Sequence, residues 1–183
     1  MTTQVKCERH DAHRTTSACE KDRWYAAYTR ANHEKKVAEQ LEFRNIEQLL
    51  PLHSSIRQWK DRKVRLMRPL FPGYVFVRTS LQKRLQVLQV PGIAGLVGFG
   101  GQPVCMPEED IQFLRWCMNY EGGVEPHPYP AVGSRVRVKG GPLAGLKGVV
   151  VHLKNRAKLV VSFDLIQRSA TVEAEQIDVE ALD

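Results

Sequence analysis

With 183 residues and a hydrophobic fraction of 43%, the chain has the composition of a folded protein of one or two small domains, which excludes an intrinsically disordered chain. No run approaches the roughly 20 apolar residues of a membrane span and no secretory signal is visible, so we expect a cytoplasmic protein without a membrane partner. The net charge of +7 and the pI near 9.4 favour contact with a polyanion. Residues 24–120 carry most of this excess, with 14 basic against 8 acidic side chains.

The first 22 residues are polar and are predicted to form a disordered leader. They contain four side chains of the types that bind zinc, namely Cys7, His10, His13 and Cys19. Their spacing matches no common zinc finger and the flanks offer nothing to pack, so a metal site is the minor interpretation. We expect no metal and no other cofactor. The four cysteines, Cys7, Cys19, Cys105 and Cys117, are widely scattered and are interpreted as cytoplasmic thiols rather than as a disulfide framework.

Strand-like and helical patterns alternate over residues 23–120. Residues 24–30 are aromatic-rich and strand-like, and a helix is predicted over 33–46, with Asn32 as N-cap and Glu34 in the first turn. Two strands follow at 48–59 and 63–78, joined at a hairpin tip (Lys60-Asp61). A helix is predicted at 81–90, ended by Pro91-Gly92, and a strand at 93–99. The last helix begins at Pro107 and has Ile111, Leu114 and Met118 on one face.

The segment RPLFPGYVFVR, residues 68–78, places a Pro-Gly pair inside an otherwise strand-like run. Pro72-Gly73 predicts a turn or bulge, with Phe71 on one side of the kink and Tyr74 on the other. Aromatics at such a kink either fill the core or form an apolar surface for a partner. The segment alone does not separate these two interpretations.

Two clusters of basic residues stand out. The first, on the predicted hairpin, contains a single acid, Asp61, among six cations: Arg57, Lys60, Arg62, Lys63, Arg65 and Arg68. Strand alternation places Val64 and Leu66 on one side and the charge along the other face, which suits either a charged edge that resists aggregation or contact with a nucleic-acid backbone. The second cluster, at the start of the first helix, is Arg30, His33, Lys35 and Lys36, and it hints at an anionic partner.

The pattern of the sequence changes after residue 120, where helical periodicity ends. Residues 121–130 are rich in glycine and proline and predict a flexible linker. Residues 131–183 form short alternating strands separated by glycines and charged turns, which is typical of a small β-barrel. No catalytic motif is present anywhere, and the pair Glu108-Glu109 suits a helix N-terminus better than acid–base chemistry, so we do not expect an enzyme.

Three motifs in order resemble the NusG family of transcription elongation factors, and in particular its specialised RfaH/UpxY-like paralogues. They are WYAAYTRANHEKKV (24–37), PLFPGYVFV (69–77) and VGSRVRVKGGPLAGLKGVV (132–150), the last resembling a KOW motif. The resemblance covers the chain from Trp24 onward and implies an α+β fold. A NusG N-terminal domain (23–120), a mainly antiparallel sheet flanked by helices, would be followed by a five-stranded SH3-like KOW β-barrel (131–183).

The resemblance also implies a function, promotion of processive elongation or antitermination on particular operons, by a factor that acts as a monomer. The surface implied to bind the clamp helices of the RNA polymerase β′ subunit consists of Trp24, Tyr25, Tyr28, Phe71, Tyr74 and Ile93. Arg30, His33 and Lys36 match positions that read the non-template DNA strand. Lys83 and Arg84 match a contact with the β subunit, although the family's His-Thr-Thr pattern is missing there.

For the barrel, the resemblance implies recruitment of a partner, such as the small-subunit ribosomal protein NusE, through a loop at Ile166. The pair Ile166-Gln167 replaces the aromatic–glycine pair of general NusG proteins and favours a specialised paralogue without Rho stimulation. A stand-alone KOW protein that binds RNA or the ribosome is the alternative. Because β-branched residues and glycines dominate residues 136–161, we predict a constitutive barrel rather than the helical hairpin of RfaH.

Overall fold

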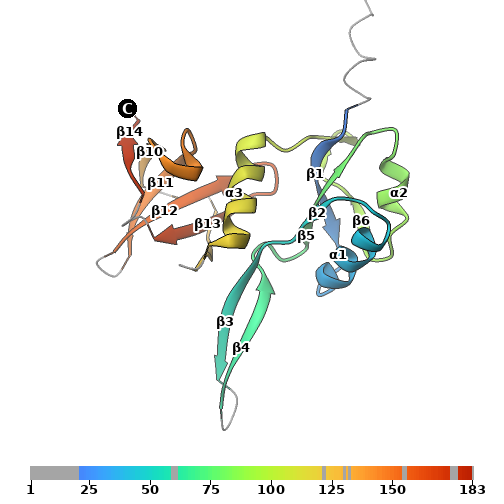
Figure 1. The fold of residues 1–183 in the computed structure, drawn as a ribbon, viewed down its shortest axis with the longest axis horizontal. Coiled ribbons are helices and arrows are strands. Elements are labelled where there is room, and N and C mark those ends of the chain that lie inside the picture. The colour runs from blue at the N-terminus through green and yellow to red at the C-terminus, as the bar shows by residue number, and fades with distance from the viewer. Residues whose placement is uncertain are drawn as a thin grey trace, which may run out of the picture.

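The computed structural model describes residues 21–58, 62–120, 123–129, 131, 133–153, 156–173 and 177–182 (Figure 1). The leader with Cys7, His10, His13 and Cys19 and the hairpin tip at Lys60-Asp61 lie outside these ranges. Within them, no helix has the length and apolar character to cross a membrane. The same ranges contain no group of three or more His, Cys, Asp or Glu side chains placed to hold a metal ion.

A four-stranded antiparallel sheet organises the N-terminal domain, in the order β2-β5-β1-β6. Its strands are β1 (Arg23–Thr29), β2 (Gln48–Leu49), β5 (Tyr74–Thr79) and β6 (Ile93–Leu96). The central strands β1 and β5 are buried on both faces, which explains their nearly continuous apolar sequences. The small hairpin of β7 (Gly98–Phe99) and β8 (Gln102–Pro103) turns at Gly100-Gly101, where both glycines have positive φ.

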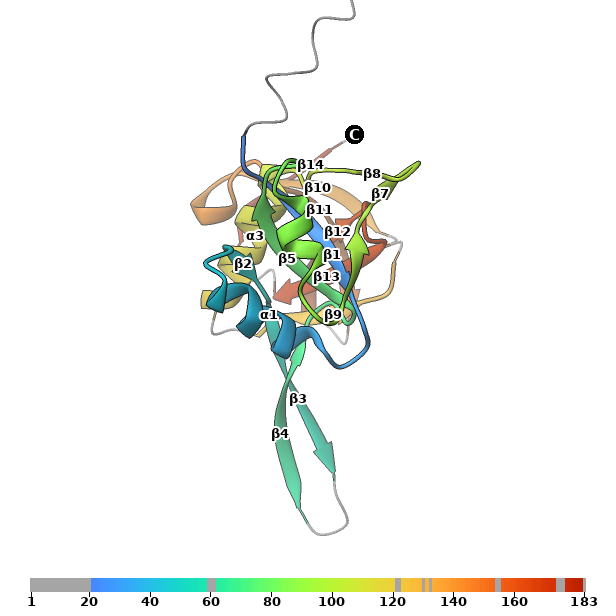
Figure 2. The same cartoon turned by 90° about the vertical axis from the view of Figure 1, so that its right-hand side faces the viewer.

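Helices cover both faces of this sheet (Figures 1 and 2). Helix α1 (Glu34–Phe43) and helix α2 (Arg84–Leu88) contribute to one core, which also contains Tyr25, Ala27, Val75 and Val77 from the sheet. Helix α3 (Glu108–Asn119) belongs to the core on the opposite face, with Trp24, Ala26 and Phe76. The alternation along β1 therefore sends neighbouring side chains into two different cores.

Two details of the helices differ from the sequence prediction. His33, not Asn32, occupies the N-cap of α1, and Asn32 instead adopts a left-handed conformation with φ of 60°, which asparagine tolerates better than most residues. In α3, Ile111 and Leu114 are buried as expected, but Met118 is exposed and Phe113 and Cys117 take its place. The apolar face is turned because α3 packs between the sheet and a second domain.

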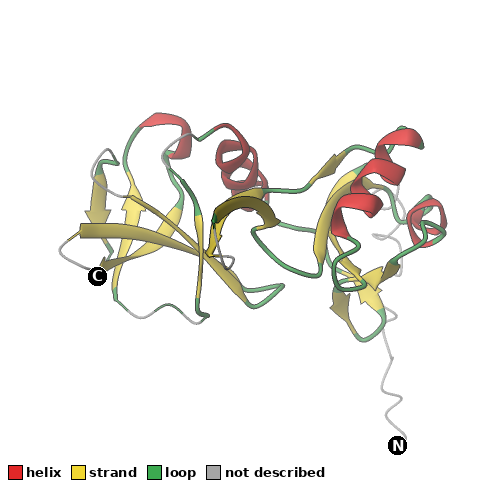
Figure 3. Cartoon of the chain, turned by 90° about the horizontal axis from the view of Figure 1, so that it is seen from below, coloured by secondary structure: helices red, strands yellow, loops and turns green. Residues whose placement is uncertain are grey.

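The C-terminal domain is a curled six-stranded antiparallel sheet in the order β14-β10-β11-β12-β13-β9 (Figure 3). Its elements are β9 (Glu125–His127), β10 (Ser134–Val138), a short 3-10 turn η1 (Gly141–Leu143), β11 (Lys147–Leu153), β12 (Arg156–Phe163), β13 (Arg168–Glu173) and β14 (Val179–Ala181). Strands run through the segment that a helical hairpin would occupy, so the structure has the predicted barrel fold.

The sixth strand, β9, comes from the segment predicted to be a flexible linker. Within that segment, residues 125–127 pair with β13, with His127 opposite Ser169 and Pro126 opposite Ala170. Proline is acceptable there because β9 is the edge strand of the sheet and one of its sides needs no donor. The linker expectation is therefore not met at these residues, and the sheet has six strands rather than five.

The two domains pack against each other through aromatic side chains. Phe163 of β12 lies 5.0 Å from Phe71 and 5.8 Å from Phe113, measured between ring centroids. Buried residues of the barrel, of α3 and of one sheet face form a single apolar cluster. In this structure the barrel is therefore docked on the N-terminal domain, whereas the sequence predicted a freely tethered barrel.

Candidate functional site

An aromatic pair, of which one member is exposed and the other half-buried, lies at the end of the two central strands. Tyr28 of β1 and Tyr74 of β5 are directly opposite in the antiparallel register. Their ring centroids are 5.5 Å apart in an edge-to-face arrangement, and 51% of Tyr28 is exposed. Cross-strand neighbours share one face of a sheet, so the register alone brings the two rings together. A tyrosine pair of this kind is suited to contact with another protein.

The kink at Pro72-Gly73 is held from two sides. The Gly73 N–H donates to Oε1 of the buried Glu34 at 2.7 Å, and the Gly73 carbonyl accepts from the Thr29 N–H at 2.8 Å. Gly73 has a φ of +85°, a conformation that favours glycine. The turn therefore leads the chain into β5 with Tyr74 beside Tyr28. Sequence analysis assigned Glu34 only to the first turn of a helix, because its partner lies 39 residues away.

Three residues predicted for the same partner surface are buried. Phe71 is only 2% exposed and packs edge-on against Phe76 and Phe163, so this member of the kink fills the core. Trp24 and Tyr25 are buried on opposite faces of the sheet. Burial on both sides of β1 explains why neither Trp24 nor Tyr25 reaches the surface. Of the predicted set, Tyr28 is exposed, while Tyr74 and Ile93 are half-buried.

The barrel borders this surface, and the residue of the barrel that was predicted to bind a partner is buried. The Arg168 guanidinium lies over the Tyr74 ring, 5.9 Å from its centroid. Ile166, in the turn between β12 and β13, is 3% exposed and belongs to the same apolar cluster as Phe71 and Phe163. Ile166 is therefore buried in the docked arrangement, and its role as a partner contact stays a prediction.

The predicted basic residues lie where β1 leads into α1. Arg30, His33 and Lys36 are all exposed. Arg30 lies two residues after Tyr28 in the chain, just beyond the end of β1. The loop is fixed by the Arg30 N–H, which donates to the Gly92 carbonyl at 2.8 Å. A Cβ at Gly92 would lie 3.0 Å from the Val37 side chain, so the two segments approach closely. Lys83 and Arg84 are exposed at the start of α2.

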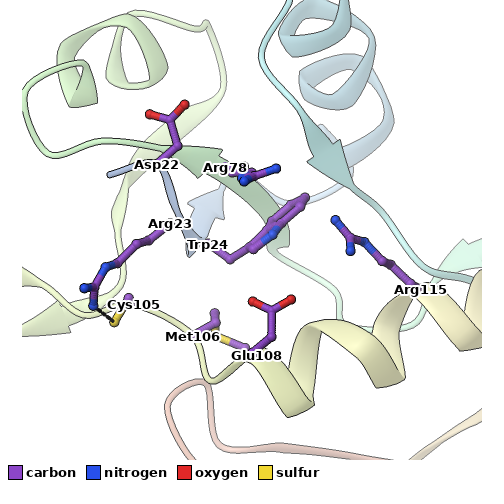
Figure 4. A pocket seen from close by; sticks show the side chains of 8 residues that line it. All are labelled: Asp22, Arg23, Trp24, Arg78, Cys105, Met106, Glu108 and Arg115. Carbon is purple, nitrogen blue, oxygen red and sulfur yellow. Dashed lines mark hydrogen bonds between the residues drawn. The ribbon is translucent and has the colours of Figure 1, made fainter. Parts of the chain in front are cut away.

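A pocket of about 380 Å³ opens beside Trp24, and sequence analysis did not predict it (Figure 4). Two of its three cations have a carboxylate partner, because Glu47 accepts hydrogen bonds from Arg78 at 3.0 Å and from Arg115 at 3.2 Å. The third, Arg23, donates to the Cys105 Sγ at 3.8 Å. The Arg115 guanidinium also lies 5.4 Å from the centre of the Trp24 ring. Asp22 and Glu108 line the same pocket and, together with Glu47, match its three arginines in number, and the two ion pairs of Glu47 join α3 to the sheet.

Two carboxylates meet where α3 approaches the barrel. Burial, together with the nearby charges of Asp164 and Glu109, raises the pKa of Asp110 from 3.8 to about 7. Asp164 belongs to the turn after β12 and accepts a hydrogen bond from the Tyr129 hydroxyl at 3.2 Å. A carboxyl group near the domain interface thus titrates around neutral pH.

Comparisons with known proteins agree with these observations. The family model described as "Transcription termination factor nusG" matches residues 22–115. The transcription termination/antitermination protein NusG of Deinococcus radiodurans is 31% identical over 180 aligned residues, which cover 83% of this chain and 95% of that protein. The protein of the same name from Thermus thermophilus is 28% identical over 173 residues, covering 83% and 94%. A solved structure on domain interaction in Thermotoga maritima NusG has a TM-score of 0.56 at 24% identity, covers 90% of this chain and 99% of that one, and shares the fold.

Proposed function

This chain belongs to the NusG family, and we propose that it binds RNA polymerase through the surface around Tyr28 and Tyr74. As a member of that family it is a non-enzymatic transcription termination/antitermination factor. The observation that carries the polymerase proposal is the contact between the exposed Tyr28 and the half-buried Tyr74, beside a turn that the Glu34–Gly73 hydrogen bond fixes. Rigid, exposed aromatic side chains are the usual anchors of a protein interface.

The proposed polymerase contact is the clamp-helix coiled coil of the β′ subunit. Tyr28, Tyr74 and Ile93 would touch it, while the buried Trp24 and Phe71 would support the sheet from behind. The exposed Lys83 and Arg84 would contact the β subunit. We place the factor in the cytoplasm, where the polymerase of a bacterium acts.

The exposed cations Arg30, His33 and Lys36 are proposed to hold the non-template DNA strand. Their position two to eight residues beyond Tyr28 in the chain would bring that strand next to the polymerase contact. In a single strand both the bases and the phosphates are accessible. The three side chains could therefore contact bases, which gives sequence preference, or phosphates, which gives binding by charge alone.

The barrel is proposed to recruit a partner such as NusE through Ile166. Ile166 is buried and belongs to the apolar cluster that the two domains share, so the proposal includes that the barrel leaves its docked position when it recruits the partner. The pair Ile166-Gln167 supports the further proposal that the chain is a specialised paralogue that acts on particular operons.

Polymerase binding is tested with the full-length double variant Y28A/Y74A. We expect the affinity for core RNA polymerase to fall by about 30-fold, equivalent to roughly 2 kcal/mol, because interface aromatics dominate binding. The matched control is F43A/F99A, which removes two exposed aromatic rings elsewhere on the same domain. Equal affinities of the two variants, with both melting like the native protein, would show that polymerase docks elsewhere.

A further inference from the structure

The hairpin of β3 (Leu52–Gln58) and β4 (Lys63–Pro69) projects from the body of the molecule (Figures 1 and 2). Its two strands pair along their whole length, from Leu52 opposite Pro69 to Gln58 opposite Lys63. Seven residues of strand span about 23 Å, about two-thirds of a turn of DNA. The hairpin is thus an arm long enough to reach a partner that the rest of the domain does not touch.

Four exposed cations line the described part of this arm: Arg62, Lys63, Arg65 and Arg68. No acidic residue occurs in 52–58 or 62–69. Within the described part of the chain, none of these cations forms an ion pair or a side-chain hydrogen bond. Positive charge that is concentrated on a projecting ribbon and left uncompensated is complementary to a polyanion.

The cations occupy both faces of the ribbon. Pairing places Lys63 and Arg65 on one face and Arg68 on the other, together with the half-buried Val64 and Leu66. The sequence prediction of a single charged face is therefore wrong for Arg68. Arg68 is an odd number of residues from Lys63 and Arg65 along β4, so its side chain belongs to the opposite face of the ribbon. A ribbon charged on both faces can meet phosphates on the two sides of a groove, whereas a ribbon charged on one face can follow only one backbone.

The spacing of the cations matches a sugar-phosphate backbone. Lys63 and Arg65 stand two residues apart on one strand, about 7 Å, and two phosphate steps of one DNA strand rise by about 7 Å along the helix axis. A two-stranded ribbon also fits the width of the major groove. These features favour double-stranded over single-stranded nucleic acid.

We propose that the β3–β4 hairpin is a DNA-binding arm that grips the phosphates of a duplex without reading its sequence. The proposal is independent of polymerase binding, since Tyr28 and Tyr74 lie on the central sheet and not on the arm. The exposed Ile56 and Met67 share a face with Arg65. Two apolar side chains beside a cation would also suit an acidic protein partner, which is the alternative occupant of the arm. The experiment below separates the two.

The test measures binding of the full-length protein to a 20-base-pair duplex of mixed sequence, without polymerase, over a series of salt concentrations. The variant K63Q/R65Q/R68Q should bind at least tenfold more weakly than the native protein at about 0.1 M salt. Its slope of log affinity against log salt should be shallower by about 0.9 for each phosphate that the variant no longer neutralises. The control R44Q/K139Q/K147Q removes three exposed cations that lie outside the arm and should retain the native slope.

Three results would overturn the proposal. Equal losses of affinity in the two triple variants would mean that only net charge matters. A loss in I56S/M67S as large as that in K63Q/R65Q/R68Q, with the native salt slope, would point to an apolar contact and hence to a protein partner. Tighter binding of either single strand than of the duplex would assign the arm to unpaired nucleic acid. Equal binding of a duplex with scrambled sequence supports the proposal.

Discussion

The rings of Phe71 and Phe163 meet edge-on, with centroids 5.0 Å apart and planes inclined at 65°. One ring comes from the N-terminal domain and the other from the barrel, and both are almost completely buried. Phe71 was expected at a surface for a partner protein, but through this contact it belongs to an apolar core that the two domains share.

Replacement of Phe71 by alanine should therefore destabilise the protein itself. We expect the free energy of unfolding to fall by about 3–5 kcal/mol, the usual cost of removing a buried aromatic ring. Denaturant unfolding of F71A measures the effect, and the matched control is F99A, which removes an exposed ring and should change stability by less than about 0.5 kcal/mol. A native-like unfolding midpoint for F71A would contradict the buried placement.

The hydrogen bond from the Gly73 N–H to Glu34 should stabilise the kink that positions Tyr74. E34A leaves that donor without its partner and should cost about 1–3 kcal/mol, whereas E34Q keeps an acceptor oxygen and should cost less. Thermal melts of the two variants give the comparison, and E39A, at an exposed position of the same helix, is the control. If E34A and E39A melt together, the hydrogen bond contributes nothing to stability.

The raised pKa of Asp110 predicts a pH dependence of stability. Because its pKa is about 7 in the folded protein and near 3.8 when exposed, the folded state binds the proton more tightly between these values, and stability falls as pH rises from about 4 through 7. D110N stays neutral and should be more stable than the native protein above pH 7, by about 1–2 kcal/mol, since the N-terminus of α3 offsets part of the effect.

Melting temperatures of native protein and D110N at pH 5 and pH 8 provide the test of that pH dependence. E108Q, which removes an exposed carboxylate from the same turn of α3, is the control. A difference between D110N and native protein that is the same at both pH values would contradict the prediction.

Loss of the cations at the start of α1 should impair the factor on some templates more than on others. R30Q/H33Q/K36Q is expected to reduce pausing or loading on responsive templates while leaving the affinity for core polymerase within about threefold, since phosphate and base contacts are separate from the tyrosine pair. Transcription on several templates, with R44Q/K139Q as a control of equal charge change, checks this. Equal losses on every template would mean contact with phosphates alone.

Local patterns in the sequence predicted most of the fold. Short-range periodicity predicted the strand at 24–30, the strand-like run at 63–78, helices α1 and α3 and the barrel strands. The turn residues Pro72-Gly73 predicted the kink within the second of these. The family resemblance supplied the order of the domains. These features depend on neighbours in the chain, which is why the sequence alone sufficed.

The missed features depend on contacts between distant segments. Phe71 and Ile166 were expected at the surface because nothing nearby in the chain indicates that the two domains pack together around a shared apolar cluster. The bond between Glu34 and Gly73 and the pairing of β9 with β13 likewise join segments that are tens of residues apart. Of the predicted polymerase surface, only Tyr28 is more than half exposed in the docked arrangement.

The apolar cluster shared by the two domains also decides how fragments of this protein will behave in solution. A fragment that ends after α3 uncovers Phe71, Phe113 and their neighbours, and a fragment that begins at β9 uncovers Phe163 and Ile166. Contiguous apolar patches of this kind cause soluble proteins to self-associate. Light scattering should therefore show each fragment associating at concentrations where the whole chain remains monodisperse, and mixing the two fragments should restore solubility as their buried surfaces find each other.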